Sequence, residues 1–240
     1  MAIVSNTGAY LDGDVLLEGF FAFDDALTGR RPTVLINHTW AGRDEFVAGK
    51  AKKLAELGYV GFAVDMYGKG VLGANPDENM KLMQPFMADR GMLQQRMKAA
   101  LAAVKLMPWV DDSKIAAIGF CFGGLCSLDL ARTGVDIKGV VSFHGLLVPP
   151  PGNALVNSIK AKILALHGHD DPLVPAEQML AFEQEMTDAG ADWQLHSYGN
   201  TMHVFTNPLA NDPIFGALYQ PDADRRSWIA MQNFLTEIFV

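Results

Sequence analysis

A short stretch in the middle of the chain places a cysteine where it can act as a nucleophile. The sequence Gly119-Phe-Cys121-Phe-Gly123-Gly follows an apolar run that starts at Ile115, and a helix-length segment comes next. This spacing is typical of a nucleophile elbow, a strand-to-helix turn so sharp that side chains at the glycine positions would clash. The turn lifts the sulfur above the sheet at a helix N-terminus, where the helix dipole favours the thiolate. We therefore predict that Cys121 is a nucleophile and that the backbone N–H of Phe122 stabilises an oxyanion.

The chain has one other cysteine, Cys126, which lies five positions further along the predicted helix. Two Cα atoms at that spacing on a helix are about 8 Å apart. A disulfide needs a shorter separation, so the two thiols are not expected to pair. We interpret Cys126 as an ordinary core residue. The lack of a disulfide framework fits a reducing compartment.

A cysteine nucleophile needs a base, and the base needs a carboxylate that orients it. Where the nucleophile sits on an elbow, the acid and then the histidine follow it along the chain. An apolar run ends in two neighbouring aspartates, Asp170 and Asp171, and His203 stands in a loop after the last predicted strand. We favour Asp171 as the acid, although either aspartate could instead cap the next helix. His203 is the predicted base, whereas His196 lies inside a strand and is interpreted as structural.

These residues need a scaffold, and the sequence alternates strand-length apolar runs with helix-length amphipathic segments. The strand runs are apolar throughout, which is typical of parallel strands covered on both faces. We therefore predict an α/β fold, with a mostly parallel central sheet and helices on both faces, formed by a single domain over residues 1–240. Ligands bind at the carboxyl ends of such strands. The predicted strands are 15–23 (antiparallel), 32–37, 60–66, 115–120, 140–143, 162–166 and 193–198, and the predicted helices are 44–57, 77–107 with breaks near Pro85 and Gly91, 123–132, 176–189 and 222–239.

Composition narrows the classes of partner. Of the 240 residues, 50% are hydrophobic, and 19 basic against 27 acidic residues give a formal net charge of −8. Nucleic acids and anionic membranes need clustered positive charge, so neither is an expected partner. The N-terminal residues lack the pattern of a signal peptide, and the longest charge-free stretch, 139–159, contains three consecutive prolines. We expect a cytoplasmic protein without a membrane helix.

Five motifs, taken in order, resemble the dienelactone hydrolase family of the α/β-hydrolase fold over nearly the whole chain. They are Asp65-Met-Tyr-Gly-Lys-Gly70, the cysteine elbow, Ser142-Phe-His-Gly145, His167-Gly-His-Asp-Asp-Pro-Leu-Val-Pro175 and His203-Val-Phe-Thr-Asn-Pro208. The resemblance implies a triad of Cys121, Asp171 and His203, with the backbone N–H of Trp40 as the second oxyanion donor. It implies hydrolysis of small-molecule carboxylic esters or lactones through an acyl-thioester intermediate, without a cofactor.

The chain departs from the family pattern at one position. Family members often read His-Glu-x-x-Gly after the strand that ends near residue 37, whereas this chain reads His38-Thr39-Trp40-Ala-Gly42. The glutamate in the family interacts with the resting nucleophile and helps to control its ionisation. Thr39 cannot accept a proton as a carboxylate does. Direct activation of Cys121 by His203 is therefore expected here.

Several features leave alternatives open. The methionine-rich segment around 68–97 is either a cap or pocket wall over the site or ordinary helix core. The glycine pattern of Gly68 to Gly73 is not followed by a helix, which argues against a dinucleotide site. The cluster of His167, His169 and the two aspartates matches no familiar ligand spacing, so no metal is predicted. The candidate pocket residues are Thr39, Tyr67, Met83, Phe86 and Phe143.

The leading functional hypothesis has three rivals. A cysteine nucleophile without the glutamate could attack other electrophiles, including phosphoesters. The chain could also carry a redox-active thiol, or it could bind a ligand on a fold that has lost catalysis. The expected partner is a small-molecule ester or lactone, and the chain is expected to be a monomer or a homodimer.

Overall fold

The computed structural model describes residues 2–152 and 159–240. The chain divides into two compact units, Met1–Ile118 and Gly119–Val240. Strand β5 (Val110–Phe120) runs from the first unit into the second. The single domain over residues 1–240 expected from the sequence stays a prediction.

The first unit contains four further strands in the order β1-β2-β4-β3. They are β1 (Ile3–Asp12), β2 (Val15–Asp24), β3 (Arg31–Asn37) and β4 (Val60–Ala63). β1 and β2 form an antiparallel hairpin, β2 is also antiparallel to β4, and β3 is parallel to β4. The sequence pattern missed β1, because most of its side chains are exposed and many are polar or small. The predicted strand 60–66 was too long, since β4 ends at Ala63.

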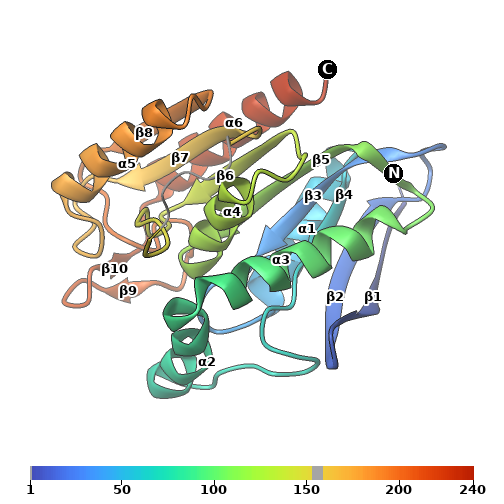
Figure 1. The fold of residues 1–240 in the computed structure, drawn as a ribbon, viewed down its shortest axis with the longest axis horizontal. Coiled ribbons are helices and arrows are strands. Elements are labelled where there is room, and N and C mark those ends of the chain that lie inside the picture. The colour runs from blue at the N-terminus through green and yellow to red at the C-terminus, as the bar shows by residue number, and fades with distance from the viewer. Residues whose placement is uncertain (1, 153–158) are drawn as a thin grey trace. The chain divides into compact units, whose positions relative to one another are not determined.

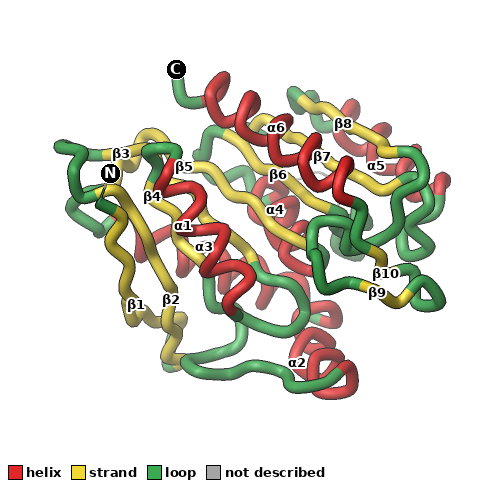
Figure 2. The backbone as a smooth tube through the Cα atoms, turned by 180° about the vertical axis from the view of Figure 1, so that it is seen from behind, coloured by secondary structure: helices red, strands yellow, loops and turns green. Residues whose placement is uncertain are grey.

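The helices of the first unit begin at side chains that accept hydrogen bonds from free backbone N–H groups. The Asp44 carboxylate accepts a hydrogen bond from the N–H of Val47 and caps α1 (Glu45–Glu56), which packs on β2 and β4. The predicted helical segment 77–107 is two helices, α2 (Pro76–Ala88) and α3 (Arg90–Lys105). Asp89 ends the first and caps the second. Helices α1 and α3 lie on opposite faces of these strands (Figures 1 and 2).

The second unit continues the alternation of helix and parallel strand. It contains α4 (Phe122–Arg132), β6 (Gly139–Phe143), β7 (Lys162–Gly168), α5 (Ala176–Asp188), β8 (Trp193–Tyr198), β9 (Asn211–Asp212), β10 (Ala217–Leu218) and α6 (Pro221–Ile238). β7 lies between β6 and β8 and is parallel to both. Helix α4 covers one face of β6, and α6 covers the other face of β6 and β7 (Figures 1 and 2). This confirms the predicted α/β class with a mostly parallel sheet.

Two short strands in the second unit were not predicted. β9 and β10 have two residues each and pair antiparallel after the loop that carries His203. Strands of this length cannot show an alternating pattern. Within the described ranges, each helix is too short or too polar to cross a lipid bilayer.

Candidate active site

Cys121 occupies a strained position between β5 and α4. Its backbone has φ +55° and ψ −116°, a combination that residues other than glycine rarely adopt. Its N–H donates to the Phe143 carbonyl at 3.0 Å. The side chain is half-buried, whereas Cys126 is fully buried in α4. The two cysteines are therefore placed as expected, one at the elbow and one in the core.

The glycines around Cys121 are required by close backbone packing. A Cβ on Gly119 would lie 1.9 Å from the carbonyl oxygen of Gly123. A Cβ on Gly124 would lie 2.5 Å from Oγ of Ser142 and 2.8 Å from Cα of Gly145. The elbow and the Ser142–Gly145 motif therefore pack directly on each other, which explains why both are rich in small residues.

Of the two neighbouring aspartates, only Asp171 is buried. Its Oδ1 accepts the N–H of Leu173 at 2.9 Å, and its own N–H donates to the Gly168 carbonyl at 3.1 Å. Asp170 is exposed, and its N–H donates to the carbonyl of Thr201 at 2.9 Å. The turn after β7 thus points one carboxylate inward and the other outward. This arrangement supports the choice of Asp171.

His203 pairs with Asp171. Its Nδ1 lies 2.7 Å from Oδ2 of Asp171, and both side chains are buried. Burial by itself lowers the pKa of His203. The electrostatic interaction with Cys121 and the hydrogen bond to Asp171 outweigh burial, so the pKa of His203 is raised above its ordinary value. The structure thus brings together two of the residues singled out in the sequence.

The ring of His203 interacts with Cys121 as well as with Asp171. Nε2 is buried and has no hydrogen bond of regular geometry among the described residues, yet Cys121 is the neighbour that most strongly raises the pKa of the ring. Contacts of this kind are often loose without substrate and tighten when the reacting groups assemble. Cys121, His203 and Asp171 all belong to the second unit.

A second histidine, His144, packs against His203. The sequence pattern indicated no role for His144. The ring of His144 lies 5.1 Å from the ring of His203 at an interplanar angle of 71°. Its Nε2 forms a hydrogen bond of 2.8 Å with Oγ1 of Thr206. His144 stands in the Ser142–Gly145 motif and has φ +38°. The motif was recognised, but only the structure brings this side chain to the back of His203.

Backbone strain gathers around these residues. In the described ranges, the residues other than glycine with positive φ are Cys121, His144, Asn200 and Val204. Val204 is branched at Cβ, and for such a residue this conformation is a clear outlier. Strained residues persist where surrounding contacts over-determine them, and they gather at functional sites. Three of the four are site residues or next to one.

In the first unit, the loop after β3 is fixed by a buried histidine. Nδ1 of His38 lies 2.5 Å from the Thr39 carbonyl, and Nε2 lies 3.3 Å from the N–H of Met66. Nδ1 therefore carries the proton and Nε2 accepts. Burial lowers the pKa of His38 to about 4, so the ring is neutral at pH 7. The hydroxyl of Tyr67 donates to the carbonyl of Trp40 at 3.0 Å.

The Asp65 motif holds Tyr67 in place. Oδ1 of Asp65 accepts the N–H groups of Tyr67 and Gly68, and Oδ2 accepts the N–H of Glu18 at 2.9 Å. The other pocket candidates fall in both units. Phe86 on α2 is buried, and the centre of its ring lies 5.7 Å from the centre of the Tyr67 ring. Met83 on the same helix is half-buried.

Phe143 ends β6 in the second unit and stacks on Phe120 at 4.7 Å. Among the methionines of the segment around 68–97, Met97 is in the core and Met80 is exposed. Met97 is therefore ordinary helix core and not part of a cap.

The side chains of His167 and His169 differ in exposure. His167 is buried, and burial lowers its pKa, whereas His169 and Asp170 are exposed. Across the part of the chain that the structure describes, no three His, Cys, Asp or Glu side chains gather as metal ligands.

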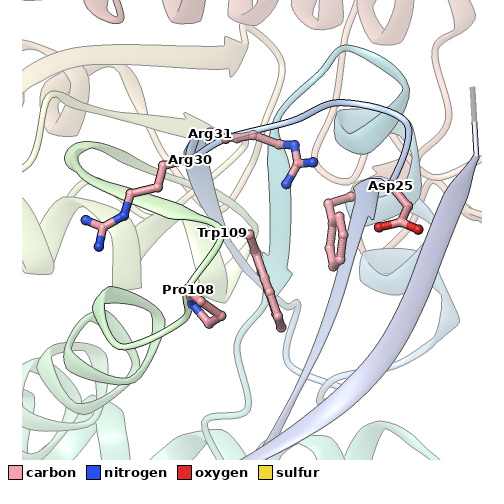
Figure 3. Close-up of a pocket in the computed structure, with 7 residues that line it drawn as sticks. Asp25, Arg30, Arg31, Pro108 and Trp109 are labelled. Atoms are coloured by element: carbon pink, nitrogen blue, oxygen red, sulfur yellow. The ribbon is translucent and has the colours of Figure 1, made fainter.

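The first unit also contains a cavity of about 470 Å³ (Figure 3). The rings of Phe23 and Trp109 stack there, with their centres 4.9 Å apart. The guanidinium of Arg31 lies 5.2 Å from the centre of the Phe23 ring. None of the seven lining residues carries a thiol, hydroxyl or imidazole, so this pocket lacks the cysteine and histidine predicted from the sequence. The lining residues are Phe23, Asp25, Gly29, Arg30, Arg31, Pro108 and Trp109.

A mostly parallel sheet alternating with helices, with a cysteine on a strained strand-to-helix elbow, is the arrangement of an α/β-hydrolase-type protein. Residues 17–239 match the dienelactone hydrolase family, and the chain belongs to that family of hydrolases. The resemblance noted in the sequence is thereby confirmed at the level of the family.

Relatives and solved structures agree with this assignment. An uncharacterized protein of Caenorhabditis elegans is 43% identical over 151 residues, which cover 62% of this chain and 96% of that one. A putative carboxymethylenebutenolidase of Yersinia pestis is 25% identical over 92% of this chain and 84% of its own length. A crystal structure of a dienelactone hydrolase-like promiscuous phosphotriesterase from metagenomic libraries is 38% identical, with a TM-score of 0.96 and 100% of both chains covered.

Proposed function

We propose that this chain hydrolyses small-molecule carboxylic esters or lactones, with Cys121 as nucleophile, His203 as general base and Asp171 as the acid that orients the base. The observation that carries the proposal is the buried contact of 2.7 Å between His203 and Asp171, in the same unit as a cysteine on a strained elbow. The names of relatives, which include putative carboxymethylenebutenolidases, support the class of substrate.

The first half of the reaction forms an acyl-enzyme. Nε2 of His203 takes the proton of the Cys121 thiol, and the sulfur attacks the carbonyl carbon. The resulting oxyanion accepts a hydrogen bond from the N–H of Phe122, and the N–H of Trp40 is the proposed second donor. When the tetrahedral intermediate collapses, the bond to the leaving oxygen breaks and His203 gives that oxygen its proton. For a lactone, the leaving alcohol stays attached to the acyl group.

The second half releases the acid. His203 removes a proton from water, the hydroxide attacks the thioester carbonyl, and the carbon–sulfur bond breaks to regenerate Cys121. Asp171 stabilises the imidazolium in both halves and keeps the proton of the neutral ring on Nδ1. Activated esters and lactones suit this chemistry better than amides, because a thiolate leaves more readily than an amine.

A panel of p-nitrophenyl esters and small lactones tests the proposal, with turnover compared between the wild type and Cys121→Ala. We expect turnover by the wild type and a loss of at least about 10³-fold in the variant, because removal of a nucleophile leaves only binding and oxyanion stabilisation. Mass spectrometry of a rapidly quenched reaction should show an acyl group on Cys121. Full activity in Cys121→Ala would contradict the assignment. Absence of turnover with reversible labelling by oxidants would favour the redox thiol.

Phosphotriesters are a second candidate substrate class. The observation that favours them is the likeness, over the full length of both chains, to a promiscuous phosphotriesterase. The same sulfur would attack phosphorus, expel an aryloxide and form a phosphoryl-thiol that water then cleaves. A phosphotriester such as diethyl p-nitrophenyl phosphate in the same panel distinguishes the two classes. Turnover of both, lost together in Cys121→Ala, would indicate one promiscuous site.

A further inference from the structure

The hairpin formed by β9 and β10 contacts the loop that carries the proposed base. Ala217 forms a parallel bridge with His203, and the N–H of Leu218 donates to the His203 carbonyl at 3.0 Å. Two residues further along, the N–H of Gln220 donates to the Phe205 carbonyl at 3.2 Å. The backbone on both sides of Val204, which has a positive φ, is therefore tied to the strand β10 and the segment after it.

The same hairpin contacts the loop that carries the proposed acid. A Cβ on Gly216 would lie 2.2 Å from Cγ and 2.6 Å from Cδ of Pro172, the residue that follows Asp171. Gly216 also has φ +83°, which favours glycine. Because the proline ring fixes φ and its Cδ is bonded to the nitrogen of the peptide from Asp171, a push on the ring displaces the Asp171 peptide.

The hairpin is closed by its own hydrogen bonds. Oδ1 of Asp212 accepts the N–H of Phe215 at 3.0 Å, and the N–H of Gly216 donates to the Pro213 carbonyl at 3.3 Å. The N–H of Tyr219 donates to the carbonyl of Ala210 at 3.0 Å. The turn therefore has a defined shape, and Gly216 presents its bare Cα to Pro172.

Burial of apolar surface does not explain the hairpin. Ile214 at its tip is 99% exposed, and Leu209 before β9 is 89% exposed. Such side chains add little to the core, because the hydrophobic contribution scales with the area removed from water. The hairpin does contribute contacts to two loops, one carrying Asp171 and the other carrying His203. These two residues are 32 positions apart in the chain.

We propose that the β9–β10 hairpin is a positioning element that keeps Asp171 and His203 at hydrogen-bond distance, with Gly216 as its contact on the acid side and Leu218 as its contact on the base side. This inference rests on the proposed function and adds residues to it. A displacement of about 1 Å in a catalytic group can cost about 10²-fold in rate, so a Cβ at position 216 acts on catalysis without touching substrate.

The test compares Gly216→Ala with two matched variants. Gly190→Ala is the control, because Gly190 also has positive φ, +63°, but has nothing within 4 Å of its Cβ position. The double variant Gly216→Ala/Pro172→Ala removes the two proline atoms that the new Cβ would strike. We expect Gly216→Ala to lower kcat by about 10–100-fold with little change in KM, Gly190→Ala to stay within about twofold, and the double variant to recover most of kcat.

A second readout separates positioning from general destabilisation. The rate of Cys121 alkylation by iodoacetamide, measured against pH, reports on the pairing of Cys121 with His203. Its profile should change in Gly216→Ala and return in the double variant. Thermal unfolding of each variant checks the fold. If Gly216→Ala does not fold, Asp212→Ala loosens the hairpin without adding atoms and should lower kcat in the same direction.

The results distinguish this inference from the proposed function. Wild-type kcat and an unchanged alkylation profile in folded Gly216→Ala overturn the positioning role while esterase activity stands. Equal losses in Gly216→Ala and Gly190→Ala, or no recovery in the double variant, also overturn it. If the wild type turns over no ester, the proposed function fails, and the alkylation profile still decides whether the hairpin positions His203.

Discussion

Oδ2 of Asp171 and Nδ1 of His203 lie 2.7 Å apart and are both buried, although 32 residues separate them in the chain. A carboxylate at this distance keeps the ring proton on Nδ1, which leaves Nε2 as the basic nitrogen. The pair also contributes to the stability of the fold, because burying a histidine or an aspartate without a hydrogen-bond partner is energetically unfavourable.

The first prediction concerns thiol reactivity. Iodoacetamide should modify Cys121 within minutes near pH 7 and leave Cys126 unmodified in the folded protein. Cys121 is half-buried at a helix N-terminus beside His203, whereas Cys126 is fully buried. Peptide mapping by mass spectrometry identifies the modified residue. His203→Ala should slow the reaction at least about tenfold, because the cationic partner of the thiolate is lost. Preferential modification of Cys126 would reverse the roles of the two cysteines.

The second prediction distinguishes the two aspartates. Asp171→Asn should lower kcat by about 10²–10⁴-fold, because an amide can hold the wrong tautomer of His203. Asp170→Asn is the matched control and should stay within about threefold, since its side chain is exposed. Steady-state kinetics with a p-nitrophenyl ester measures both. A larger loss of kcat in Asp170→Asn would show that Asp170, and not Asp171, is the acid.

The third prediction concerns acid stability and His38. Burial lowers the pKa of His38 to about 4, from 6.5. The unfolded chain therefore binds this proton at a higher pH than the folded chain does. Stability from this site is present above pH 6.5 and is lost as the pH falls toward 4, by on the order of 3 kcal/mol.

Urea unfolding at pH 7.0, 5.5 and 4.5 measures the effect of His38. His38→Gln should be less stable at pH 7, because two hydrogen bonds of the loop after β3 are disturbed. The gap between variant and wild type should then narrow as the pH falls, since the variant has no proton to bind. A constant gap across this range would show that His38 does not titrate in this window.

The fourth prediction concerns an ion network in the second unit. Nε and Nη2 of Arg132 contact the two carboxylate oxygens of Glu185 at 2.8 and 2.7 Å, and Nη1 lies 3.1 Å from Asp129. The Arg132 side chain is fully buried. Arg132→Met should lower the free energy of unfolding by about 3–5 kcal/mol, because the buried carboxylate of Asp129 and the partly buried carboxylate of Glu185 lose their cation.

An exposed pair provides the control for Arg132. Arg225 lies 3.1 Å from Asp222 on α6, with side chains that are 59% and 60% exposed. Arg225→Met should change the free energy of unfolding by less than about 1 kcal/mol, because solvent screens exposed pairs. Equal losses in the two variants, measured by urea unfolding, would contradict the role given to burial.

The sequence by itself determined the class of fold and the order of the reactive residues. Each longer strand and helix is a local pattern of apolar spacing, and its ends carry local signals such as Asp44 and Asp89. The sequence signal of the elbow is also local, because Gly119, Cys121 and Gly123 lie within five consecutive residues and Gly119 packs on the carbonyl of Gly123. For these features the nearby chain contains the physical cause. The predicted elements agree with the structure to within a few residues, except for β1, β9, β10 and the start of β5, which begins at Val110 and not at Ile115.

Tertiary structure decided what local pattern could not. Asp170 and Asp171 are chemically identical neighbours, and only the turn after β7, held against the Thr201 carbonyl, decides which one is buried. His144 gained a place beside His203 through packing between distant segments. The strands β9 and β10 are too short to leave a pattern. Their position, with Gly216 against Pro172, depends on contacts between loops far apart in sequence, and these exist only once the chain has folded.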